Sequence, residues 1–175
     1  LLRQLTGDFN QWPRGSVPAI TVRASRAENA MYSSKDFQTR LTMSLREPRF
    51  PWLDERADAD REDLRGLHED IAEATEFWSR LRSGSSEREL RREFEEHAPL
   101  RAMKWVVVRD AGAMCSTKRG TEPSQHILSC MEMAEETNSV WIVFGTPPVG
   151  KVWEKHDEIS RRAVIVFIDR YRETP

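Results

Sequence analysis

Apolar and polar side chains alternate in two stretches near the start of the chain. The segments VPAITVRA at residues 17–24 and FQTRLTMSLR at residues 37–46 place apolar side chains at every second position over much of their length. A period of two is typical of a half-buried strand. Pro48 and Pro51 follow the second stretch, and proline cannot continue a central strand. We therefore predict two strands, joined by the polar residues 25–36.

The middle of the chain has the spacing of helices. Apolar side chains recur at intervals of three and four positions between residues 64 and 81, on an otherwise charged segment. Ser86 and Glu89 then have the spacing of a capping box, which predicts a second helix that carries Leu90 and Phe94 and ends at Pro99. These features predict a helical hairpin with an acidic outer face.

Strands and helices alternate in the last part of the chain. A strand is expected at residues 104–108 and a helix at 122–137. The next strand, VWIVF at residues 140–144, shows no alternation, which predicts burial on both faces. A turn at residues 145–150, a helix at 153–161 and a last buried strand at 163–168 complete the pattern.

Together the elements predict an α+β or α/β fold, with a mixed sheet and an inserted acidic helical hairpin packed on it. The pattern divides the chain into a basic strand unit at residues 1–53, the acidic hairpin at 54–99 and a β-α-β-β unit at 100–175, within one compact domain. A length of 175 residues suits one domain. No apolar window approaches the roughly 18 residues of a membrane helix, so we expect an intracellular, soluble protein without membrane insertion.

Charge follows the same division. Residues 54–97 contain 15 acidic and 8 basic residues, whereas residues 1–53 contain 4 acidic and 8 basic ones. The cations are 22 arginines and 5 lysines, and the planar fork of arginine suits phosphates and carboxylates. The basic start therefore favours contact with RNA or another acidic surface, which the acidic middle would repel.

One loop carries the residue types of an active site. In KWVVVRDAGAMCSTKRG, residues 104–120, Asp110 follows an apolar strand at the place where α/β proteins bind ligands. A phosphorylated ligand or a metal could bind between Asp110 and Arg119, but the spacing matches neither common phosphate-binding fingerprint. We therefore expect an exposed polar loop and name no catalytic residue. A small α/β enzyme acting on a phosphorylated ligand at residues 110–119 is kept as the alternative.

Histidine and cysteine offer two further kinds of site. His126 and Cys130 lie four positions apart on a predicted helix and could face one metal ion, but zinc needs two more ligands. Cys115 could form a nucleophilic pair with a histidine, which no motif supports. We predict no metal site and no cofactor, and two ordinary thiols in a reducing compartment.

The chain contains six tryptophans. Trp78, Trp105 and Trp141 fall inside predicted helices and strands, which indicates core packing. The other three stand beside prolines or charges and are candidates for a partner interface or a stacked base: Trp12, Trp52 and Trp153. A single-stranded RNA-binding module that uses tryptophan and arginine is the second alternative.

One segment carries a family resemblance. RASRAENAMY at residues 23–32 and TRLTMSLR at residues 39–46 resemble protein forty-nine of the mitochondrial ribosomal large subunit. That family has a strand ending in a basic residue, a polar turn, a Pro-Val-Tyr element, a basic strand and a helix with an acidic start. Here Ala30-Met31-Tyr32 replaces Pro-Val-Tyr, and residues 63–71 correspond to the helix. The spacing also resembles the release-factor-like peptidyl-tRNA hydrolases, whose Gly-Gly-Gln this chain lacks.

The resemblance implies a non-catalytic structural component of the mitochondrial ribosome, in contact with rRNA and neighbouring proteins. Its acidic hairpin would contact protein. The phosphate contacts that it implies are Arg23, Arg26, Lys35, Arg40 and Arg46. Lys118 and Arg119 are further cations that could contact a partner. The sequence pI of about 6.2 favours a peripheral subunit that other proteins hold in place.

Overall fold

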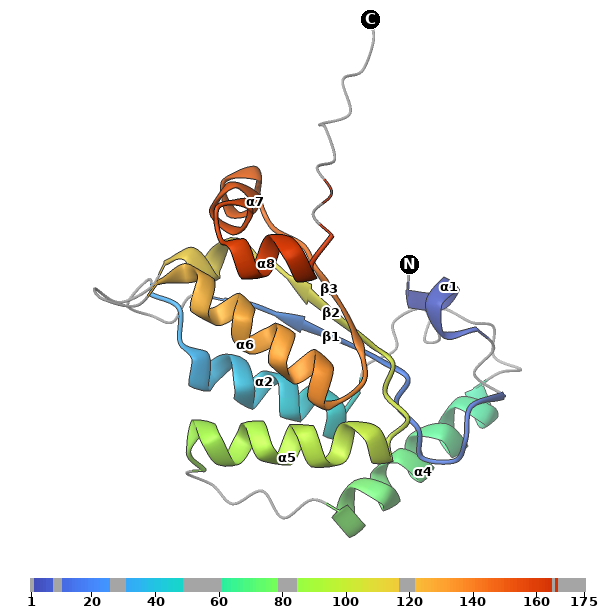
Figure 1. Cartoon of the computed structure of the whole chain (residues 1–175). Helices are drawn as coiled ribbons and strands as arrows, with labels where there is room; N and C mark the ends of the chain where they lie inside the picture. The colour runs from blue at the N-terminus through green and yellow to red at the C-terminus, as the bar shows by residue number, and fades with distance from the viewer. Residues whose placement is uncertain are drawn as a thin grey trace, which may run out of the picture.

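A parallel three-stranded sheet forms the centre of the protein (Figure 1). This computed structural model describes residues 2–7, 11–25, 31–48, 61–78, 85–116, 122–164 and 166. The strands are β1 (Ala19–Arg23), β2 (Trp105–Arg109) and β3 (Val140–Val143), in the order β1-β2-β3. Ala19 pairs with Trp105, and Trp105 pairs with Val140, in a parallel register on both sides of β2. The predicted α+β or α/β fold is confirmed, but the described strands are all parallel, where a mixed sheet was expected.

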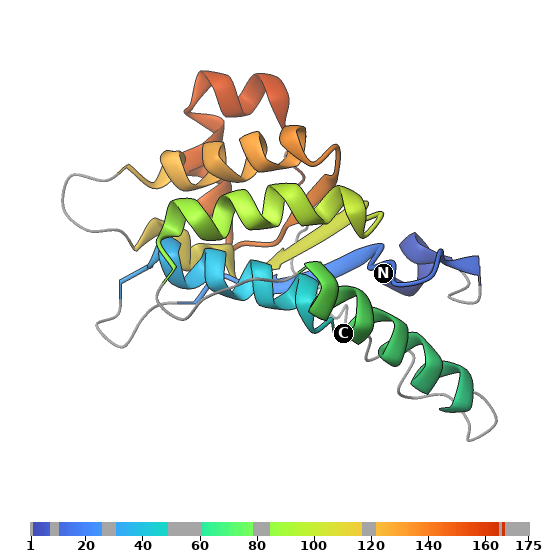
Figure 2. The ribbon, with the colours of Figure 1, turned by 90° about the horizontal axis from the view of Figure 1, so that it is seen from below.

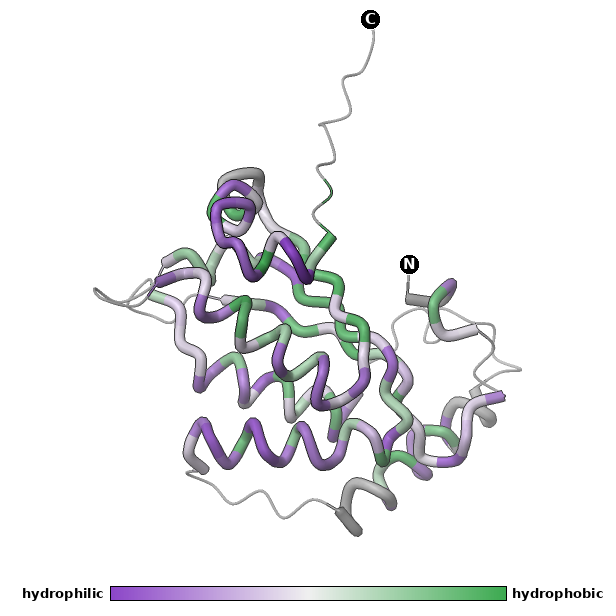
Figure 3. Tube along the Cα trace, viewed as in Figure 1, coloured by the Kyte–Doolittle hydropathy of each residue, from purple (hydrophilic) through white to green (hydrophobic). Residues whose placement is uncertain are grey.

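Helices cover one face of this sheet. α2 (Ser34–Arg46) packs on β1, α6 (Pro123–Glu136) packs on β3, and α5 (Glu87–Leu100) lies on α2 (Figure 1). The buried side chains of these helices share one core cluster with alternate strand residues, namely Ile20, Val22, Val106 and Val108. Figure 3 shows hydrophobic positions concentrated along the strands and hydrophilic ones along the outer side of α5.

The second predicted strand is wrong, because residues 37–46 belong to α2. Ser33 caps this helix: its hydroxyl accepts a hydrogen bond from the Asp36 amide at 3.2 Å. The buried positions are spaced as one helical face: Phe37, Gln38, Leu41, Thr42 and Leu45. Leu41, Met43 and Leu45 produce the apparent alternation, but Met43 is exposed. The buried face of the helix includes the polar residues Gln38 and Thr42, so its apolar positions do not show a helical period in the sequence.

The two predicted middle helices exist, but they do not lie side by side as a hairpin. α4 (Arg61–Trp78) projects from the end of the molecule, whereas α5 runs along α2 (Figures 1 and 2). The capping box is confirmed, since the Ser86 amide donates to Glu89 Oε2 at 2.7 Å and the Glu89 amide donates to Ser86 Oγ at 3.2 Å. Pro99 lies in the last turn of α5, one residue before its end.

The last part of the chain contains more helix than expected. α7 (Pro147–Glu154) begins inside the predicted turn at residues 145–150, and α8 (Asp157–Arg162) follows it. The expectation that β3 is buried on both faces is wrong, because none of its four residues is fully buried and Val140 is 52% exposed. Of the predicted strand at 163–168, the structure describes Ala163, Val164 and Val166, which form no strand. The other residues of that run lie outside the described part.

Two short elements complete the described chain. These are α1 (Leu2–Thr6), before β1, and the 3₁₀ helix η3 (Ala111–Cys115), directly after β2. None of the helices in the described ranges is both long enough and apolar enough to cross a bilayer.

Candidate anion-binding site at the carboxyl edge of the sheet

Two arginines stand side by side where β1 and β2 end. Arg23 and Arg109 are register partners on neighbouring strands, and both are exposed. The preceding residues Val22 and Val108 are buried against the helices. Because successive strand residues face opposite sides of a sheet, the two arginines lie on the face away from those helices. Like charges directly opposite each other on a sheet are destabilising, so this pair favours a bound anion.

Asp110 lies next to this pair and contacts one of the two arginines. Its backbone is left-handed, with φ 57° and ψ 36°, and its Oδ2 accepts a hydrogen bond from Arg23 Nε at 2.5 Å. The conformation turns the chain sharply from β2 into η3. The side chain makes no capping hydrogen bond to η3. Asp110 therefore neutralises part of the charge of Arg23 and leaves Arg109 without an ion pair among the described residues.

A third arginine reaches the same edge from α2. Arg40 Nη1 donates to Ser25 Oγ and to the carbonyl oxygen of Arg23, the latter at 3.5 Å. These contacts hold the chain where it leaves β1. We refer to Arg23 and Arg109 on the open face of the sheet, together with Arg40 on the helix-covered side of the same edge, as the arginine cluster, which is net positive even with Asp110 included.

Backbone hydrogen bonds hold both ends of η3, the element that follows Asp110. The Ala111 amide donates to the Phe144 carbonyl at 2.9 Å, which ties the start of η3 to the end of β3. The Tyr32 amide donates to the Ser116 carbonyl at 2.7 Å, which ties the end of η3 to the segment before α2. These two bonds tie η3 to β3 and to the segment before α2, next to the arginine cluster.

The structure brings together only some of the cations that the sequence indicated. Lys35 lies in the first turn of α2. The hydrogen bonds with Ser86 lower the pKa of the Glu89 carboxyl, and the charge of Lys35 adds a smaller contribution in the same direction. Arg46 lies in the last turn of the same helix, away from the cluster. Arg109 was missed, because only the β1–β2 register places it beside Arg23. Arg26, Lys118 and Arg119 lie outside the described residues.

The tryptophans differ in how much of each side chain is exposed and could contact a partner. Trp153 is only 8% exposed and belongs to the core, so its ring is not available as an interface residue in this structure. Trp12 is half-buried, and its indole nitrogen donates to the Thr6 carbonyl at 2.9 Å. Trp52 lies outside the described residues. Trp141 packs edge-on against Phe94 with ring centroids 6.1 Å apart, in agreement with its expected packing role.

The cysteines and histidines form no activated site. Burial raises the pKa of the Cys115 thiol and raises that of Cys130 to about 12, so both thiols stay protonated near neutral pH. The His126 ring packs edge-on against Tyr32, with ring centroids 4.5 Å apart. In the described part of the chain, no three His, Cys, Asp or Glu side chains are grouped closely enough to hold a metal.

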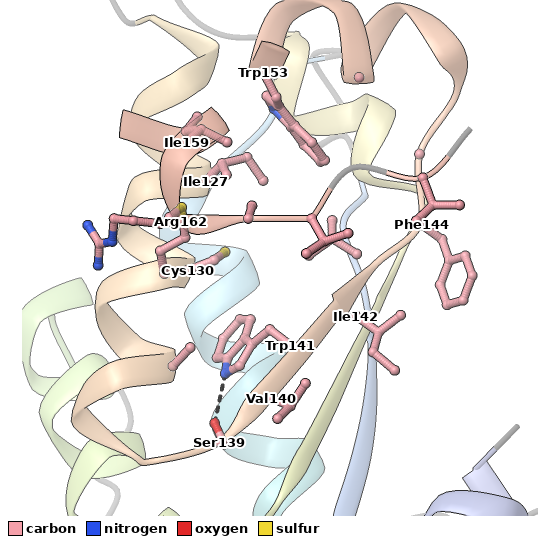
Figure 4. Close-up of a pocket in the computed structure, with 18 of the residues that line it drawn as sticks. Ile127, Cys130, Ser139, Val140, Trp141, Ile142, Phe144, Trp153, Ile159 and Arg162 are labelled. Carbon is pink, nitrogen blue, oxygen red and sulfur yellow. Dashed lines mark hydrogen bonds between the residues drawn. The ribbon is translucent and has the colours of Figure 1, made fainter. Parts of the chain in front are cut away.

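A second feature is a mainly apolar cavity of about 730 Å³ beside β3 (Figure 4). Its walls come from β3, α6, α7, α8 and the chain just after α8. Cys130, Trp141 and Trp153 line it, and the Trp141 indole donates to Ser139 Oγ at 2.9 Å. Arg162 lies at its rim, where it forms ion pairs with Glu158 at 2.7 Å and with Glu135. Among the described residues that line the cavity, the charged ones are Glu135 and Arg162, which pair with each other, so this lining does not resemble a phosphate site.

Comparison with known proteins gives no relative: no family model matches the chain, and no curated protein is detectably similar to it.

Proposed function

We propose that the protein is a non-catalytic component of a ribonucleoprotein assembly that contacts RNA phosphates through the arginine cluster. The observation that carries this proposal is the pairing of Arg23 with Arg109 on one face of the sheet. A phosphate between the two guanidinium groups would relieve their repulsion and accept hydrogen bonds from both. Such contacts add affinity for any sequence, as expected of a subunit that RNA holds in position.

The contacts of Asp110 favour binding over catalysis. Its carboxylate is engaged by Arg23, and the neighbouring thiol of Cys115 has a raised pKa. A phosphoryl-transfer enzyme instead needs a free metal-binding carboxylate or an activated nucleophile. The alternative of an enzyme at residues 110–119 therefore has less support. Binding of nucleotides and Mg²⁺, measured by calorimetry and abolished in Asp110→Asn, would revive it.

The assembly that we propose is the mitochondrial ribosomal large subunit, on the strength of the resemblance at residues 23–46. Arg23 and Arg40 belong to that segment and to the arginine cluster. One part of the resemblance is weaker than the sequence implied, since residues 39–46 form helix rather than strand. The acidic outer surface of α4 and α5 fits contact with neighbouring proteins. A mitochondrial location follows from the same proposal.

Loss of the two paired arginines should weaken RNA binding. We expect Arg23→Gln with Arg109→Gln to lower affinity for a mixed-sequence RNA oligonucleotide by roughly tenfold or more, because two phosphate contacts are lost. The slope of log affinity against log salt should fall by about one for each contact. Fluorescence anisotropy over a salt series measures both quantities.

Lys104→Gln with Arg92→Gln is the matched control. It removes the same charge from exposed positions on β2's amino side and on α5. Equal losses in the two double variants would show that only net charge matters and would overturn the proposed site. Sedimentation of the native protein as a free 20.4 kDa species, in salt that preserves ribosomes, would overturn the proposed assembly.

A further inference from the structure

The outer edge of β3 carries backbone groups that another strand could bind. The amides of Val140 and Phe144 donate to the carbonyls of Lys104 and Val108, both at 2.8 Å, and so face β2. Alternate residues of a strand direct their amides to opposite sides, so Trp141 and Val143 present theirs to the outer edge. Within the described ranges, no strand pairs with that edge.

The apolar cavity lies along this same edge. Trp141 and Val143 line it from β3, and Ile127 and Ile159 line it from α6 and α8 (Figure 4). An open edge beside an apolar surface invites pairing with another chain, and native proteins usually cover it. The cavity is thus a place for an apolar strand rather than for a charged ligand.

The chain itself supplies a suitable strand directly after α8. AVIVFI at residues 163–168 is uninterrupted apolar sequence, mostly β-branched, as in strands buried on both faces. Ala163, Val164 and Val166 already line the cavity. Val164 is 92% exposed and Val166 is 73% exposed, which makes them the most exposed large apolar side chains in the described part of the chain. The apolar side chains of Val164 and Val166 are therefore largely in contact with solvent in this structure.

The connection from β3 to this segment suits a parallel strand. A parallel crossover needs about a dozen residues or more, usually helical, and α7 and α8 provide them. α8 packs against α6, the helix that makes the preceding crossover from β2 to β3. A segment added next to β3 would continue the order of the sheet with the same handedness.

We propose that residues 163–168 dock along the outer edge of β3 as a fourth parallel strand and fill the apolar cavity. The strand hydrogen-bonds with the outer backbone groups of Trp141 and Val143, and it buries Val164 and Val166, which share one face of a strand, against the cavity wall. This inference is independent of the proposed RNA contact. A strand from another protein or from a second copy of this chain is the competing occupant.

Hydrogen exchange on the full chain tests the proposal. The Trp141 and Val143 amides should exchange at least about tenfold more slowly than free amides, because a docked strand protects them. Val164→Asp with Val166→Asp should remove that protection and lower the unfolding temperature. Val152→Asp is the matched control, since Val152 is 36% exposed on α7 and does not line the cavity.

Three results would overturn the proposal. The first is fast exchange of both edge amides in the wild-type chain. The second is an equal effect of the double variant and Val152→Asp on protection and unfolding temperature. The third is protection that disappears on dilution together with a dimer seen by light scattering, since a second copy would then be the occupant.

Discussion

At the scale of single residues, burial is the main cause of the pKa shifts of the packed His126 and Tyr32 side chains. His126 is half-buried against Tyr32, and loss of hydration lowers the pKa of its imidazole below 6.5, while the carboxylate of Glu87 opposes the shift. The pKa of the Tyr32 phenol is raised, again chiefly by burial. The folded chain therefore binds a proton at His126 less readily than the unfolded chain does.

This difference predicts a pH dependence of stability. A lowered folded-state pKa gives stability that is present above pH 6.5 and is lost as the pH falls through the folded-state value. We expect the unfolding temperature to drop between pH 7.5 and pH 5.5, and His126→Gln to reduce that drop. Gln125→Ala is the control, because it changes an exposed position on the same helix without removing a titratable group and should keep the wild-type profile. Superimposable profiles for wild type and His126→Gln, measured by calorimetry, would refute the assignment.

Sequence reasoning found some site residues and missed others for a definable reason. The family resemblance at residues 23–46 indicates Arg23 and Arg40 as phosphate contacts. Arg109 became relevant only through its register with Arg23, which depends on the pairing of distant strands. Trp153 was assigned to the surface from its charged neighbours, yet it is buried because α7 turns it toward the core. The residues next to Trp153 in the sequence therefore do not indicate which residues surround it in the folded chain.

At the scale of elements, the sequence predicts a feature correctly where that feature does not depend on packing against other elements. The capping box at Ser86 and Glu89 is a backbone device that needs only its own turn, and the structure contains both of its hydrogen bonds. α2 failed as a prediction because its buried face includes Gln38 and Thr42, which pack against other elements. Thr42 Oγ1 donates to the Gln38 carbonyl at 2.9 Å and to the Leu90 carbonyl at 3.3 Å. The shorter of these bonds lies within α2 itself, so Thr42 can be buried beside α5 although it is polar.

The capping box should contribute measurably to α5. Ser86→Ala removes the acceptor of the Glu89 amide and should lower the free energy of unfolding by about 1 kcal/mol. Arg88→Ala, on the exposed side of the same helix, should change it by less than about 0.5 kcal/mol. Urea unfolding at neutral pH measures both. Equal values for the two variants would mean that the first turn of α5 frays in the native protein.

At the scale of the whole molecule, one buried side chain joins three distant parts of the chain. Arg101 follows α5, and its Nη1 donates to the carbonyls of Gly15 and Ile71, each at 3.1 Å. Its own carbonyl accepts a hydrogen bond from the Val17 amide at 2.8 Å. Desolvation lowers the pKa of the guanidinium, although this group keeps its proton near neutral pH. Arg101 therefore connects α4 and the segment before β1 to the end of α5.

Removal of this side chain should loosen α4 more than the sheet. Arg101→Met leaves two carbonyls without their donor, and we expect a loss of about 2–3 kcal/mol in the free energy of unfolding. Hydrogen exchange should speed up in α4 before it does in α6. Arg65→Met, at an exposed position on α4, serves as the control. A uniform increase over all helices would contradict a local connecting role.

The packing of the elements against one another could not be predicted from the sequence, because contacts between distant segments decide it. Periodicity shows which face of an element is apolar, but not which other element covers it. The acidic segment was therefore expected to be a hairpin on the sheet, whereas α5 covers α2 and α4 projects from the end.

The strand order also has a consequence for the time course of folding. β2, α6 and β3 are consecutive, but α2, α4 and α5 separate β1 from its partner β2 along the chain. Closing that long loop costs entropy before any contact compensates it, so we expect β2-α6-β3 to form early and β1 to join late. During synthesis, β1 leaves the ribosome long before β2 has been translated. Its apolar residues then remain accessible, which makes the nascent chain a natural client for chaperones that shield extended apolar segments.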